Sequence, residues 1–145
     1  QMEIASIIIA ALALLVSIAS LVKNSAASKT ANDLTKGQVE MQIRSMITVA
    51  KAHFSEMSNQ LAANPDNPTL KASVSAALED VANAYDEACA KYLDGKVDKQ
   101  RFKQLYVNEI RNWVDSEAVK DKYIMPQSRF HATVKVYDEW NNLER

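Results

Sequence analysis

The residues that could build a metal site are few and widely separated in this sequence. His53 and His131 are the only histidines, and Cys89 is the only cysteine. A zinc site needs three or four convergent His, Cys or carboxylate ligands. Two distant histidines and one thiol do not supply that set, so the sequence predicts no metal and no other cofactor.

The remaining chemical candidates are a lone thiol and a group of carboxylates. Cys89 shares an apolar helix face with aromatic residues, which predicts a buried and inert thiol. Paired carboxylates could carry acid–base catalysis. We instead expect most of them on a solvated face, with Glu87 and Lys91 as an i, i+4 pair. The acidic stretch consists of Glu79, Asp80, Asp86 and Glu87. Phosphate-binding glycine loops and nucleophile elbows are absent from the sequence, so we expect no enzyme.

Composition favours an all-α fold. The 145 residues include two glycines and three prolines, too few for the turns of a many-stranded sheet. Strong helix formers such as Ala, Leu, Lys and Glu are abundant. The net charge is −1, whereas a nucleic-acid-binding protein normally carries a basic excess. We therefore expect no nucleic-acid partner.

The N-terminal segment reads as a membrane anchor. Ile4–Val22 contains no charged residue, no proline and no glycine. Its 19 residues would span about 28 Å as a helix, close to the hydrocarbon thickness of a bilayer. A secretory signal peptide is the alternative, but the apolar run is long and no basic segment precedes it. The sequence predicts a transmembrane anchor over residues 1–23, with membrane lipid as a partner.

Charges beside the anchor predict its orientation. Lys23, Lys29 and Lys36 follow the anchor, and no basic residue precedes it. The positive-inside rule then places the C-terminal domain in the cytoplasm, anchored to the inner membrane. A basic leader upstream of Gln1 would reverse this orientation. Small residues spaced three or four apart predict a self-association stripe within the membrane. The stripe consists of Ser6, Ala10, Ala13, Ser17 and Ser20.

The anchor is expected to continue into a helical stalk or tether over residues 24–38, followed by a bundle of about four helices over residues 39–145. Apolar residues at helical spacing begin at Val39 and end near Leu61. The expected contact between the stalk helix and the bundle comprises Val39, Ile43, Met46, Phe54 and Met57. Without proline before Asn64, the anchor and this helix could form one helix of about 60 residues.

Loop and capping residues delimit the later helices. Asn67 and Pro68 predict the start of a helix that ends near Leu93, before Gly95. Asp98 predicts the start of the next helix. Its expected inward residues are Phe102, Leu105, Tyr106, Ile110, Trp113 and Val114. Residues 115–118 either continue that helix or restart one at Ser116. A last helix is expected over residues 127–143, with Phe130, Val134, Tyr137, Trp140 and Leu143 on one face.

Two resemblances bear on function. The segments YDEACAKYLDGKVDKQRFKQLY (85–106), NEIRNWV (108–114) and VKVYDEW (134–140) resemble a group of uncharacterised bacterial membrane proteins. That resemblance implies a single N-terminal span and a helical cytoplasmic domain, without a known activity. The N-terminal Gln1, Glu3 and apolar run are also similar to type IV pilins. In pilins the glutamate comes two residues later and the head is usually a sheet.

The leading interpretation is a non-enzymatic, membrane-anchored assembly or scaffold protein. It would form homo-oligomers through the anchor and stalk, and it would present the bundle to a protein partner. The alternatives are a pilin-like subunit of a filament on the cell surface and an enzyme with an unfamiliar site.

Overall fold

The computed structural model describes the backbone of residues 2–142 and the side chains of residues 17–142. Within the described residues every regular element is a helix, which confirms the all-α class. The chain divides into two compact units, Gln1–Thr35 and Lys36–Arg145. The bundle expected from residue 39 corresponds to the second unit, which begins at Lys36.

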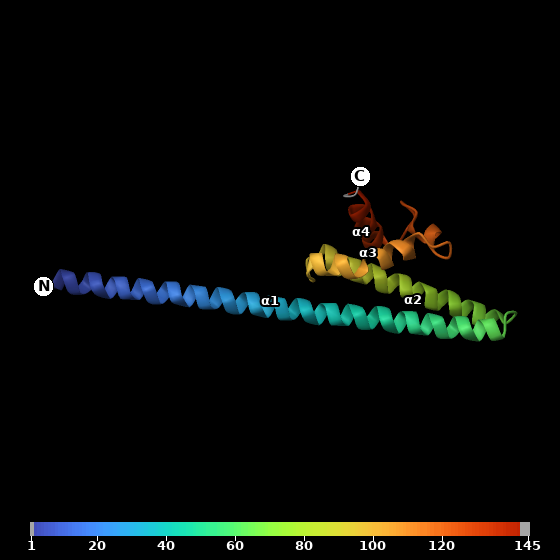
Figure 1. Ribbon diagram of the computed structural model, residues 1–145, viewed down its shortest axis with the longest axis horizontal. Coiled ribbons are helices and arrows are strands. Elements are labelled where there is room, and N and C mark those ends of the chain that lie inside the picture. Colours follow the sequence, from blue (N-terminus) through green and yellow to red (C-terminus); the bar gives the residue numbers. More distant parts are fainter. Residues whose placement is uncertain (1, 143–145) are drawn as a thin grey trace. The chain divides into compact units, whose positions relative to one another are not determined.

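The first unit is the N-terminal part of helix α1, which runs from Met2 to Ala63 (Figure 1). The side chains of residues 17–35 are exposed. Among the residues whose side chains are described, no helix combines the length and the apolar character needed to cross a membrane. The expected anchor, Ile4–Val22, lies mostly outside those residues.

The second unit begins with the C-terminal part of α1, which the loop at residues 64–67 joins to α2 (Pro68–Leu93). The Asn67 side chain accepts hydrogen bonds from the backbone N–H groups of Thr69 (2.9 Å) and Leu70 (3.2 Å). These bonds satisfy donors that have no partner inside the helix, so the predicted start of α2 is confirmed. Gly95 follows the helix with φ +69°, a conformation that favours glycine.

Helix α3 (Lys99–Val114) also begins where the sequence predicts. The Asp98 carboxylate accepts a hydrogen bond from the backbone N–H of Arg101, and this bond lowers the pKa of Asp98. The helix neither continues through residues 115–118 nor restarts at Ser116. The Ser116 hydroxyl instead donates to the carbonyl of Trp113 at the end of α3. A short 3₁₀ helix, η1 (Lys120–Tyr123), follows.

The last helix, α4 (His131–Asn142), begins four residues later than the expected start at residue 127. Residues 125–127 form a turn with a cis Met125–Pro126 bond, and the Ser128 hydroxyl accepts from the backbone N–H of Phe130. The local hydrogen bonding in this segment is therefore that of a turn. The expected position of Leu143 lies outside the described residues.

The core of the second unit lies where α2 meets the three other helices. Among its largest fully buried side chains are Tyr85, Phe102, Ile110, Val136 and Trp140. Tyr92 packs edge-on against Trp140, with ring centroids 5.4 Å apart and an interplanar angle of 83°. These aromatic contacts join α2, α3 and α4 into one apolar interior.

Three expected inward positions differ from the structure. Leu105 is 50% exposed, because the buried positions Phe102 and Ile110 place the core-facing side of α3 away from it. In α4, Thr133 and Val136 are fully buried, whereas the expected Val134 and Tyr137 are only half-buried at the core margin.

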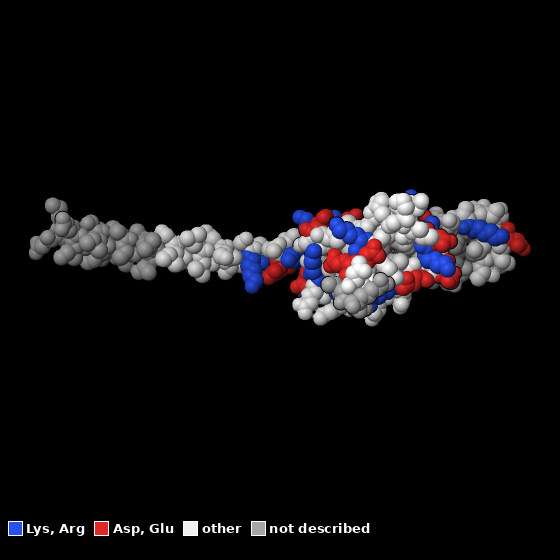
Figure 2. Space-filling model, turned by 90° about the horizontal axis from the view of Figure 1, so that it is seen from above, with Lys and Arg blue, Asp and Glu red and all other residues white. Residues whose placement is uncertain are grey.

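Charged side chains of both signs lie on one face of the second unit. Figure 2 shows Lys and Arg interspersed with Asp and Glu on the face in view. That face has no broad region of one sign.

Candidate functional site

The expected self-association stripe falls only partly within the described side chains. Ser17 and Ser20 are exposed on α1. The other positions of the stripe, Ser6, Ala10 and Ala13, lie outside the residues whose side chains are described. The stripe therefore stays a prediction from the sequence.

The expected stalk contacts come together on the inner face of α1 in the second unit. Ile43 is 2% exposed and belongs to the core. Val39, Met46 and Phe54 are half-buried against that core, and Met57 is half-buried further along the helix. In this chain the set joins α1 to α2 and the rest of the same unit.

A buried tyrosine, a carboxylate and a lysine link α2, α3 and α1. The Tyr85 hydroxyl donates to Glu109 Oε1 at 2.6 Å, and Lys51 Nζ donates to the same oxygen at 2.8 Å. Burial raises the pKa of Tyr85, and the bond to Glu109 raises it further. Burial alone would raise the pKa of Glu109, but the bonds from Lys51 and Tyr85 outweigh it and lower that pKa. Glu109 is therefore ionised and the phenol protonated at neutral pH, an arrangement that binds the helices together.

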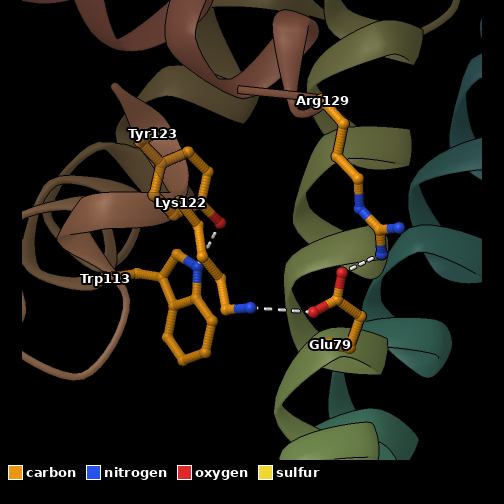
Figure 3. Close-up of polar contacts among 5 residues, drawn as sticks. All are labelled: Glu79, Trp113, Lys122, Tyr123 and Arg129. Carbon is orange, nitrogen blue, oxygen red and sulfur yellow. Dashed lines mark hydrogen bonds and ion pairs between the residues drawn. The ribbon is translucent and has the colours of Figure 1, made fainter. Parts of the chain in front are cut away.

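A second charged cluster ties the connector after α3 to α2 (Figure 3). Glu79 on α2 accepts from Lys122 Nζ at 2.9 Å, and its other oxygen pairs with Arg129. Beside this cluster, Trp113 Nε1 donates to the Tyr123 hydroxyl at 2.6 Å. The carboxylate has two cations as partners, so it holds the connector against α2.

Asp86 has a comparable role at the start of α4. One of its oxygens accepts from both the backbone N–H of Thr133 (2.8 Å) and its hydroxyl (3.1 Å). The expectation of a solvated acidic face therefore holds for Asp80 and for Glu87, which pairs with Lys91. It is wrong for Glu79 and Asp86, which are half-buried and join separate elements. Sequence reasoning missed them because their cations and donors lie more than 40 residues away in the chain.

The lone thiol is buried, as the sequence predicts, and both histidines are exposed. Cys89 is fully buried, and burial raises the pKa of its thiol to about 12. His53 and His131 are exposed. No group of three or more His, Cys, Asp or Glu side chains among the described residues is placed to bind a metal ion.

The surface of the second unit is hollowed on each side of α1. Between α1 and α3 lie neighbouring cavities of about 330 and 390 Å³, which share Arg44, Leu105 and Tyr106. Between α1 and α2 a shallower depression of about 610 Å³ is lined by apolar residues and bordered by Asp80 and Glu87. The cavities beside α3 combine apolar walls with charged residues of both signs.

No family model, curated protein or solved structure matches this chain.

Proposed function

We propose that this chain is a non-enzymatic, membrane-anchored assembly protein that self-associates and presents its second unit to a protein partner. The observation that carries the proposal is the sequence of Ile4–Val22, which is predominantly apolar and contains no charged residue, proline or glycine. The basic residues after it favour a cytoplasmic second unit on the inner membrane.

The use of polar groups in the second unit supports a structural rather than a catalytic role. Glu79, Asp86 and Glu109 each accept hydrogen bonds from a different element of the fold. Both oxygens of Glu79, and one oxygen each of Asp86 and Glu109, bind donors of the same chain, so these carboxylates hold helices in place. A catalytic acid or base would instead need a free position beside a substrate.

Membrane attachment is tested by fractionating cells that express the full chain. The chain should remain with the membranes after alkaline carbonate extraction, whereas a variant lacking Ile4–Val22 should become soluble. Release of the intact chain by carbonate would refute the anchor. The mass of the detergent-solubilised chain at several concentrations tests self-association, and a strictly monomeric species would contradict it.

Orientation is tested by adding protease to intact cells. A cytoplasmic second unit would be protected until the cells are lysed. Cleavage in intact cells would reject the cytoplasmic placement, and it would favour a subunit of a surface filament.

A further inference from the structure

The depression between α1 and α2 is an apolar surface with an acidic edge. The two helices lie side by side (Figure 1), and Met46, Val49 and Ala50 of α1 form one wall. Val49 is 66% exposed. On the α2 side, Asp80 and Glu87 border the depression about two helical turns apart. The depression has a volume of about 610 Å³, and all its lining residues belong to these two helices.

Asp80 is the border charge that has no partner in its own chain. Glu87 is paired with Lys91, whereas Asp80 is exposed and makes no hydrogen bond or ion pair with any residue that the structure describes. An unpaired carboxylate beside an apolar wall favours an occupant that brings an apolar side chain together with a positive charge, because such an occupant matches both properties.

The other side of α1 carries this combination of groups. Met41 is 74% exposed, more than any other large hydrophobic side chain among residues 17–142. Arg44, one turn further along, is exposed and makes no ion pair with a carboxylate in the described part of the chain. Its guanidinium lies beside the Tyr106 hydroxyl, where it opposes the rise in the pKa of Tyr106 that burial causes. We call Met41, Arg44 and the exposed Thr48 the basic edge of α1.

We propose that the depression between α1 and α2 receives the basic edge of a second copy of the chain. Arg44 of one copy meets Asp80 of the next, and Met41 lies against the apolar wall at Val49. The charges support this pairing, because each of the two groups is exposed and has no ion-pair partner within its own chain. The inference rests on the self-association proposed above and gives it a place in the second unit.

The contact is head-to-tail, because the basic edge and the depression are different surfaces on two sides of α1. Each copy offers its basic edge to one neighbour and its depression to the other. Association of this kind forms rings or continues into open chains. A two-fold contact would instead join identical surfaces and stop at two copies.

Charge reversal in the full chain tests the pairing by sedimentation velocity in detergent across a concentration series. Arg44→Glu and Asp80→Arg each place like charges across the contact, so each should weaken association by about tenfold or more, or about 1.4 kcal/mol. Lys71→Glu and Asp66→Arg are the matched controls, because they make the same changes of charge at exposed positions that border neither surface. Both controls should associate as the wild type does.

Mixing the two variants separates a broken contact from a folding defect. In an equimolar mixture, Asp80 of an Arg44→Glu copy can meet Arg44 of an Asp80→Arg copy, and the two reversed charges can meet in turn. The mixture and the double variant Arg44→Glu/Asp80→Arg should therefore both recover association, whereas a folding defect would not be rescued. Weak association of the single variants without recovery in the mixture would refute the pairing of Arg44 with Asp80.

Cross-linking between two different cysteine variants tests the direction of the contact. Cys89 is buried, so an introduced surface cysteine is the reactive thiol of the folded second unit. Thr48→Cys lies on the basic edge and Asn83→Cys borders the depression, and both positions are exposed. A mixture of these variants should form dimers with a short thiol cross-linker, whereas neither should do so alone. Equal cross-linking of Thr48→Cys by itself would indicate a two-fold contact and would overturn the head-to-tail arrangement.

The behaviour of the wild type decides which proposal fails. A wild type that is monomeric throughout would refute both self-association and this contact. An oligomeric wild type whose charge-reversal variants associate normally would refute the contact alone. Trp113 and Trp140 both lie in the second unit, so tryptophan fluorescence checks that each variant is folded.

Discussion

Replacing Tyr85 with phenylalanine removes one hydroxyl from the link between α2, α3 and α1. Tyr85 is 1% exposed, and its hydroxyl donates to the ionised Glu109 at 2.6 Å. Hydrogen bonds to charged groups contribute about 1.5–3 kcal/mol to stability. Lys51 would still satisfy the carboxylate, so we expect a loss near the lower end, about 1.5–2 kcal/mol.

Tyr137 offers a matched control for this substitution. Its hydroxyl donates to Asp115 at the same distance, 2.6 Å, but the bond is exposed to solvent. Water replaces an exposed partner readily, so Tyr137→Phe should cost about 0.5 kcal/mol or less. Urea unfolding of the full chain, followed by tryptophan fluorescence, gives both free energies from the shift in midpoint at constant slope.

The pH dependence provides a second criterion. The pKa of Glu109 is lowered in the folded state, so its contribution is present above the unfolded value of about 4.3 and is lost as the pH falls through the lower folded value. The difference between the wild type and Tyr85→Phe should shrink in that acid range. Equal costs for Tyr85→Phe and Tyr137→Phe at neutral pH would refute the argument that burial makes the Tyr85–Glu109 bond strong.

Two further predictions concern a helix start and the thiol. Asn67→Ala removes the acceptor for two backbone N–H groups at the start of α2. It should lower the free energy of unfolding by about 1 kcal/mol, measured by the same urea titration. Asn67→Asp keeps an acceptor and should retain most of that free energy. Cys89 should react with a thiol reagent at neutral pH only after urea unfolds the second unit, because it is buried and its pKa is raised to about 12. Rapid labelling of the folded chain would show that the α2 interior opens more readily than its packing indicates.

Local signals in the sequence predict the start and end of α2 and the start of α3. Asn67, Pro68, Gly95 and Asp98 act through hydrogen bonds and backbone angles within four residues of each position. Such signals do not depend on the rest of the fold. The starts of α2 and α3 could therefore be read from the sequence alone.

Features that depend on distant partners could not be read in this way. The late start of α4 follows from a turn at residues 125–127 and from the acceptor that Asp86 provides across the unit. Glu79 looked like part of a solvated face because its partners, Lys122 and Arg129, lie in a connector without helical periodicity. The cavities between α1 and α3 form only where these two helices lie along each other, so no local signal in either helix predicted them.

The bond from Thr133 to Asp86 has a consequence for the order of folding. An isolated helix of 12 residues, the length of α4, is only marginally stable in water. Its first turn depends on a carboxylate 47 residues earlier in the chain. During synthesis α2 leaves the ribosome before residues 131–142. The Asp86 carboxylate can therefore already be in position when those residues emerge. Helix α4 then forms against a surface that already exists.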